Sequence, residues 1–156
     1  MADIFDKLMV FWKDIPKPAP SAVKDLEVFA LRNKKSLPND LAEYFIKLNG
    51  TNSEYDANFF RFYSLGEFKT IEEEFVEWNG LPDYSKALGV IPEHNDYYLF
   101  ADYSFHAFAY AIKLYEKGFS GINEVCVISG GNYKQIAGSF TEFLELYIKD
   151  CSLVFL

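Results

Sequence analysis

Cysteine and histidine are scarce in this sequence, which limits the chemistry that it can support. Only two of each occur among 156 residues. Cys126 lies in a strand-like run and Cys151 near the end of the chain, a spacing that predicts neither a disulfide framework nor a zinc site. His94, within the polar run from Glu93 to Asp96, has no second spaced group of ligands beside it. We therefore expect reduced cysteines, no metal and no cofactor.

Basic residues are also few. The chain has 15 Lys and Arg against 23 Asp and Glu, which gives a net charge of −8 at pH 7. Nucleic acids and anionic lipid surfaces are themselves negatively charged, so this balance disfavours both as partners. It favours a partner with a basic surface. We expect a protein partner, with no nucleic acid and no membrane.

Long apolar runs are absent. The longest ones in the sequence are far shorter than the roughly 20 residues that a membrane helix needs. The first residues, Met1-Ala2-Asp3, do not form a basic segment followed by an apolar core, as a secretory leader would. These absences predict a cytoplasmic protein.

Complete catalytic motifs are missing. The run from Gly118 to Gly121 resembles a nucleophile elbow, but the required second glycine is replaced by Ile122. The pair Gly130-Gly131 is interpreted as a hairpin turn, because no lysine of a nucleotide-binding loop follows it. Asp102 could act as a general base near His106, or it could accept backbone hydrogen bonds at a turn. The second interpretation is favoured, since no other catalytic group accompanies Asp102, and we predict no enzyme activity.

Apolar and aromatic residues are abundant instead. Hydrophobic residues make up 50% of the chain and aromatic residues 19%, which is ample for one sizeable core. The stretch 90–115 predicts a β-hairpin with strands at residues 97–102 and 107–115. Both faces of this hairpin are apolar, so it belongs in a sheet covered on both sides, or on one side with a patch left for a partner. If the turn has two or four residues, the expected cross-strand pairs are Asp102 with Ala107, Phe100 with Ala109, and Tyr98 with Ala111.

The remaining segments alternate between helical and strand-like patterns. Further strands are predicted at residues 59–65, 125–129 and 133–137. Helices are predicted at residues 3–15, after Ser21, after Pro38, and after capping boxes at Thr70 and Ser139. We expect Phe143 and Leu144, on the apolar face of the last helix, to be buried.

Together these elements predict one α+β domain over residues 1–156. Its sheet is expected to be mostly antiparallel, with five or six strands flanked by helices. Residues 1–20, an N-terminal helix and a proline-rich linker, are interpreted as an extension of this domain.

Several short motifs follow one another along the chain. They are Leu37-Pro38-x-Asp40 with Asn49-Gly50, Ile91-Pro92 before Phe100-Ala101-Asp102-Tyr103, Tyr110-Ala111-Ile112, and Ala137-x-Ser139-Phe140-x-x-Phe143-Leu144. In order and spacing, from about residue 26 to residue 150, they resemble the SUKH superfamily. This superfamily includes yeast cell-wall synthesis regulators and many bacterial immunity proteins. The resemblance implies a helix-flanked, mostly antiparallel sheet, no active site, and a protein-binding scaffold that in bacteria neutralises a polymorphic toxin.

Acidic residues are densest at residues 72–77. Acids in the first turn of a helix stabilise it against its dipole, so a solvated helix face is one interpretation. Three consecutive acids exceed what capping requires, so a surface for a basic partner is the other. Acids can steer an encounter and tyrosines can supply packed anchors. The first candidate contact set is Glu73, Glu77, Asp83 and Tyr84, and the second is Glu93, Asp96 and Tyr97.

The predicted function is that of a cytoplasmic immunity protein, or antitoxin, that binds a cognate toxin and blocks it by occlusion. Toxins that act on nucleic acid, such as nucleases, need basic surfaces to reach phosphates, and an acidic binder can cover such a surface. The alternative is a general protein-binding scaffold or regulator that resembles the yeast cell-wall synthesis regulators.

Overall fold

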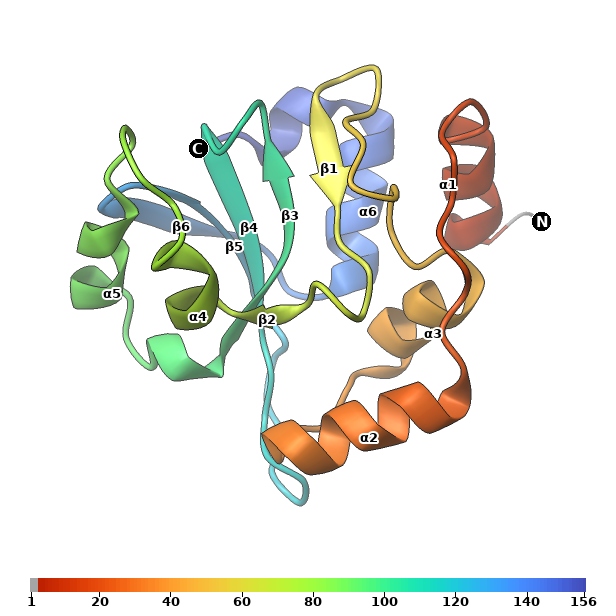
Figure 1. Ribbon diagram of the computed structural model, residues 1–156, viewed down its shortest axis with the longest axis horizontal. Helices are drawn as coiled ribbons and strands as arrows, with labels where there is room; N and C mark the ends of the chain where they lie inside the picture. The colour runs from red at the N-terminus through yellow and green to blue at the C-terminus, as the bar shows by residue number, and fades with distance from the viewer. Residues whose placement is uncertain (1–2) are drawn as a thin grey trace.

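A six-stranded antiparallel sheet forms the centre of the computed structural model, which describes residues 3–156 (Figure 1). The strands lie in the order β1-β3-β4-β5-β6, and β2 pairs with β3 beyond the end of β1. Their bounds are β1 Phe60–Phe62, β2 Lys69–Thr70, β3 Tyr97–Tyr103, β4 Phe108–Lys113, β5 Val125–Ser129 and β6 Asn132–Ala137. The predicted α+β class with a mostly antiparallel sheet is confirmed.

Helices surround this sheet in chain order. The α-helices are α1 Ile4–Phe11, α2 Val23–Asn33, α3 Asn39–Lys47, α4 Ile71–Phe75, α5 Ala87–Val90 and α6 Phe140–Lys149. Three short 3₁₀ helices are η1 Tyr84–Lys86, η2 His94–Asp96 and η3 Cys151–Val154. The capping box at Thr70 is present, whereas α2 begins after Ala22 and not after Ser21 as predicted. At α6, Ser139 caps the helix, but the Glu142 carboxylate accepts from the backbone of Gly138 instead of closing a box.

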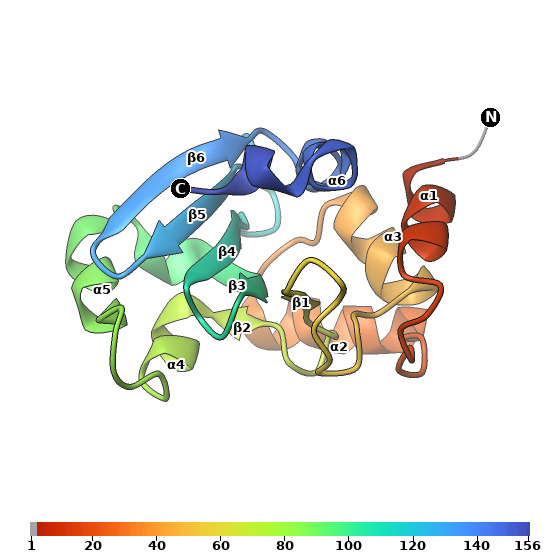
Figure 2. The ribbon, with the colours of Figure 1, turned by 90° about the horizontal axis from the view of Figure 1, so that it is seen from above.

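Both faces of the sheet are covered, which is the first of the two arrangements predicted from the doubly apolar hairpin. Figure 2 shows α6 on one side of the strands and α4 and α5 on the other. In β4, Tyr110 faces the larger core beneath α6, and its neighbours Ala109 and Ala111 face the smaller core beneath α4 and α5. Phe143 and Leu144 of α6 are fully buried in the larger core, as expected from the helix pattern.

The register of the central hairpin differs from the prediction. Asp102 lies opposite Ala109 and not Ala107, and Ala111 lies opposite Leu99 and not Tyr98. The strands extend to a Tyr103–Phe108 pair, and the loop between them has left-handed conformations. A bulge between Leu99 and Ala101 then shifts the pairing of residues 97–99 with residues 111–113 by one position. The residue pattern alone indicates neither feature.

The N-terminal helix is an integral part of the larger core. Trp12, at the end of α1, is fully buried, and its Nε1 donates to the hydroxyl of Tyr147 in α6 at 2.9 Å. That hydroxyl in turn donates to the carboxylate of Asp56. The proline-rich linker is held by Asn49, whose amide donates to the carbonyl oxygen of Ala19 at 2.8 Å. The helix α1 and the proline-rich linker are therefore packed against the rest of the domain.

Candidate partner-binding surface

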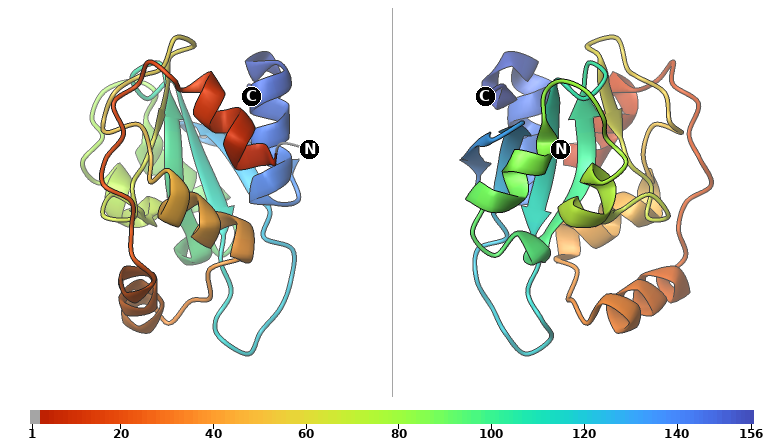
Figure 3. Two further views of the ribbon diagram at one scale, coloured as in Figure 1. Left: turned by 90° about the vertical axis from the view of Figure 1, so that its right-hand side faces the viewer. Right: turned by 60° about the vertical axis from the view of Figure 1, so that its left-hand side comes forward.

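The two acidic clusters predicted as contact sets lie on one side of the molecule. Figure 3, right, shows α4 and α5 in front of the same face of the sheet. The first residues of α4 lie next to η2, where the Glu72 carboxylate is 3.9 Å from Nε2 of His94. The acids of α4, Asp83 before η1, and the acids Glu93 and Asp96 therefore belong to one acidic face, which covers the smaller core.

Internal contacts use some of these carboxylates. Glu73 accepts from the Thr70 hydroxyl at 2.9 Å and so caps α4. Glu93 pairs with Lys113 at 2.5 Å, and Asp96 pairs with Lys35 at the same distance. All three acids therefore have structural roles, and the charges of Glu93 and Asp96 are partly neutralised by their lysines.

Other carboxylates of the acidic face project into solvent. The side chain of Glu77 is 69% exposed, and its cation Lys69 is 3.9 Å away. Glu72 is 54% exposed and faces only His94. Asp83 is exposed, and the hydroxyl and backbone of Ser85 donate to it, which lowers its pKa and keeps it charged. Glu72, Glu77 and Asp83 are therefore the carboxylates most available to a cationic partner.

The two tyrosines predicted as anchors are buried. Tyr84 is 1% exposed, and its hydroxyl donates to the carbonyl oxygen of His106 at 2.7 Å. Tyr97 is 6% exposed, and its hydroxyl donates to Glu124. Both rings pack in the smaller core beneath the acidic face. The expectation that they supply exposed anchors is corrected, and the acidic residues around them remain as candidates.

A buried charge cluster, formed by Asp102 and the side chains that donate to it, lies at the end of the sheet where β1 begins and β3 ends. It was not predicted from the sequence. Asp102 is 0% exposed and accepts four hydrogen bonds from three side chains. The hydroxyls of Tyr55 and Tyr63 each lie 2.7 Å from its oxygens. Arg61 donates to one of those oxygens through Nε at 3.0 Å and Nη2 at 2.7 Å.

These contacts correct the expected role of Asp102. Its carboxylate accepts from side chains and not from the backbone of the turn. The interpretation as a general base is also not supported, because His106 contacts Arg61 (Nε2 to Nη2, 3.5 Å) and the carboxylate is already saturated. Burial and the charge of Asp102 raise the pKa of Tyr63 well above its usual range, so this phenol stays a donor. One signal of this cluster was present in the sequence: side chains alternate along a strand, so Arg61 in β1 and Tyr63 just after it lie on the same face.

His106 is held between the charge cluster and α4. Its ring stacks on Trp78 with the centroids 3.6 Å apart and an angle of 4° between the planes. Burial lowers the pKa of His106, and the negative charge of Asp102 opposes this shift. Trp78 in turn donates from Nε1 to Glu74 at 3.2 Å. The charge cluster is thus connected to the acidic face.

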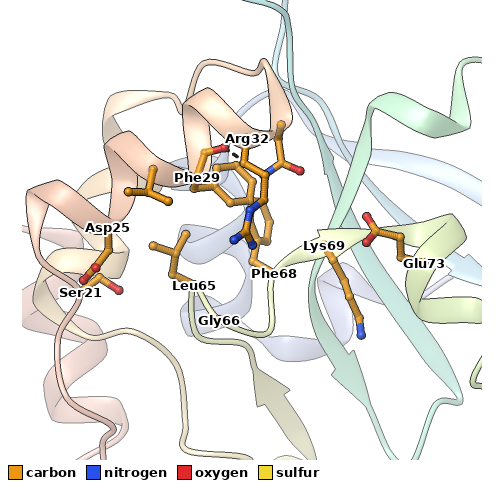
Figure 4. Close-up of a pocket in the computed structure, with 11 residues that line it drawn as sticks. Ser21, Asp25, Phe29, Arg32, Leu65, Gly66, Phe68, Lys69 and Glu73 are labelled. Atoms are coloured by element: carbon orange, nitrogen blue, oxygen red, sulfur yellow. Dashed lines mark hydrogen bonds between the residues drawn. The ribbon is translucent and has the colours of Figure 1, made fainter.

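A groove of about 470 Å³ lies between α2 and the loop after β1 (Figure 4). Figure 4 shows Arg32 reaching toward Phe68, with Lys69 and Glu73 at one end of the groove and Asp25 at the other. Its lining residues are Ser21, Asp25, Val28, Phe29, Arg32, Asn33, Leu65, Gly66, Phe68, Lys69 and Glu73. Acidic and basic side chains both border the apolar side chains of this groove. The groove therefore suits a polar segment of a protein better than a simple ion.

Within residues 3–156, no group of three His, Cys, Asp or Glu side chains is arranged to hold a metal ion. None of the helices in this described part of the chain is long and apolar enough to span a membrane.

Comparison with known proteins agrees with the resemblance drawn from the motifs. A search of curated proteins finds no match. The model of the SMI1/KNR4 family (SUKH-1) matches residues 20–146, which span α2 to most of α6 and leave out α1. Since this match covers most of the chain, the protein belongs to the SMI1/KNR4 family (SUKH-1).

Proposed function

We propose that this protein is an immunity protein that binds a basic toxin domain through its acidic face and blocks it by occlusion. Membership of the SUKH-1 family supports a protein-binding role, because the SUKH superfamily includes bacterial immunity proteins. The observation that carries the proposal is the surplus of carboxylates on and around α4. Those at Glu72, Glu77 and Asp83 project into solvent.

The basic side chains near the acidic face are too few to neutralise all of its carboxylates. The ammonium group of Lys69 lies 3.2 Å from the carboxylate of Glu74 and 3.9 Å from that of Glu77, so two carboxylates share a single positive charge. Lys35 and Lys113 are each paired with an acid of the second cluster, and Lys86, in η1, lies near Asp83. Together with the net charge of −8, this arrangement attracts a positively charged protein and repels nucleic acid.

Electrostatic attraction matters for an antitoxin because the toxin must be captured before it reaches its substrate. Complementary charge raises association rate constants from about 10⁵–10⁶ to as much as about 10⁸–10⁹ M⁻¹ s⁻¹ at low salt. The bound antitoxin then covers the basic surface that a nuclease needs for phosphates. Such a mechanism needs no catalytic group in the antitoxin.

Charge reversal on the acidic face should slow binding without unfolding the protein. We expect Glu72→Lys combined with Glu77→Lys to lower the association rate constant by about tenfold at low salt, since attraction is replaced by repulsion. The dependence of the rate on ionic strength should also become flatter, because fewer charges remain to be screened. Stopped-flow mixing with the inactivated toxin domain encoded beside this gene measures both quantities.

The matched control carries the same change of net charge at another place. Asp14 follows α1 and Glu145 lies on α6, and both side chains are exposed. Figure 2 shows α1 and α6 away from α4. Asp14→Lys combined with Glu145→Lys should slow association much less. Equal slowing by the two pairs would show that only net charge matters, and failure of the unaltered protein to bind would refute the proposed function.

A further inference from the structure

Two exposed phenylalanines lie in neighbouring loops, one before β1 and one between β3 and β4. Phe59 precedes β1 and is 56% exposed, and Phe105 in the turn between β3 and β4 is 77% exposed. Their loops are joined, because the backbone N–H of Ser104 donates to the carbonyl oxygen of Phe59 at 2.8 Å. We call Phe59 and Phe105, with the neighbouring side chains of Tyr55, Arg61, Trp78 and His106, the aromatic tip.

The backbone of the aromatic tip is strained. Phe59 has φ of 68°, and the consecutive residues Ser104, Phe105 and His106 have φ of 47°, 53° and 73°. Glycine adopts such left-handed conformations readily, whereas bulky residues do so at a cost in stability. The fold would therefore be better served by glycine at position 105. A ring that is strained and mostly in water contributes little to the core, which points to a role outside it.

The side chains beneath this ring are held rigidly. Phe105 packs on Tyr55 with ring centroids 4.8 Å apart, and the guanidinium carbon of Arg61 lies 5.2 Å from the centroid of the Tyr55 ring. Tyr55 and Arg61 are both fixed by the buried carboxylate of Asp102. Rigid aromatic and arginine groups that need no ordering on binding are typical of interaction hot spots.

The aromatic tip continues directly into the acidic face. His106 stacks on Trp78, which follows α4 and donates to Glu74. Glu77, the most exposed acid near α4, is the residue before Trp78 in the sequence. A partner seated on the tip would therefore meet carboxylates along one side.

We propose that the aromatic tip is the packed anchor with which this protein holds the basic toxin domain, a proposal that rests on the proposed function. The occupant that fits is a protein surface with an apolar pocket bordered by Lys or Arg side chains. The Phe105 ring fills the pocket, and the bordering cations pair with the carboxylates of the acidic face or lie against aromatic faces. This assigns to Phe105 the anchoring role that the buried Tyr84 and Tyr97 cannot fill.

The test is the variant Phe105→Gly, measured for both folding and binding. Glycine removes the ring and relieves the left-handed strain, so the unfolding temperature should be equal or higher. Loss of a hot-spot ring should weaken binding of the inactivated toxin domain encoded beside this gene by about 30-fold, mainly through faster dissociation. Phe119→Gly is the matched control, because Phe119 is 70% exposed and its loop, between β4 and β5, lies at the opposite end of the sheet in Figure 1 from the turn between β3 and β4. Its binding should be unchanged.

The possible outcomes separate this inference from the proposed function. If the unaltered protein and Phe105→Gly bind equally well, the anchor is refuted and the immunity function stands. If the unaltered protein does not bind, the proposed function fails and the anchor fails with it. A fall of more than about 5 °C in the unfolding temperature of Phe105→Gly would show that the ring serves the fold, which would also overturn the anchor.

Discussion

Replacing Asp102 by alanine should lower the free energy of unfolding by about 3 to 5 kcal/mol, because it removes one partner of a buried ion pair. The variant leaves the Arg61 guanidinium, whose side chain is only 23% exposed, without its carboxylate. It also leaves the hydroxyls of Tyr55 and Tyr63 without an acceptor. Urea denaturation at neutral pH, with the slope compared to that of the unaltered protein, measures the loss.

Two further variants make this expectation specific. Asp102→Asn keeps the shape and one carbonyl oxygen, so it should lose less stability than Asp102→Ala. Asp83→Ala removes an exposed carboxylate that caps the short helix η1, and it should cost much less stability than Asp102→Ala. If Asp102→Ala costs no more than Asp83→Ala, the charge cluster does not hold the upper end of the sheet together.

Truncating Phe143 to alanine should have an effect of similar size. This ring is fully buried between α6 and the sheet, and it packs against Phe100 and Tyr110 with centroids 5.0 and 5.3 Å away. Loss of a buried aromatic ring leaves a cavity and typically costs about 3 to 5 kcal/mol. Chemical denaturation of the variant measures the shift of the midpoint.

The control for Phe143 is a phenylalanine outside the core. Phe119 is 70% exposed, and its truncation to alanine should change stability by less than about 0.5 kcal/mol. An unfolding midpoint of Phe143→Ala close to that of the unaltered protein would mean that α6 does not pack on the sheet as described.

The order and type of the main elements could be predicted from the sequence because they depend on local patterns. The alternation in residues 107–115 and the helical spacing around Phe143 are signals within one element. The capping box at Thr70 is likewise a signal between neighbours, and the structure contains it. Burial on both faces of the hairpin followed from the same alternation.

Details that depend on distant residues could not be predicted in this way. The partners of Asp102 are about 40 positions earlier in the chain, and Trp12 reaches Tyr147 across 135 positions. The hairpin register was missed because it depends on left-handed residues at Phe105 and His106, where the sequence has no glycine.

The candidate surface residues differ in how well their exposure could be predicted. Charge is visible in a sequence because acids stay at the surface unless they are paired, so Glu77 and Asp83 are exposed as expected. A tyrosine side chain can be exposed or buried, because its ring is apolar and its hydroxyl is polar. Tyr84 is buried, and its hydroxyl donates to backbone carbonyl oxygens in the core. The exposed ring that could anchor a partner is at Phe105, in a turn.

The most direct test of the central claim, that this protein neutralises a toxin by binding it, is co-expression with the active toxin domain encoded beside its gene. Survival of the producing cells and co-purification of a stable complex are the expected results, and charge reversal at Glu72 and Glu77 should reduce the protection. Cell death despite full expression of both proteins, with no complex recovered, would contradict the immunity function and favour a general scaffold or regulator.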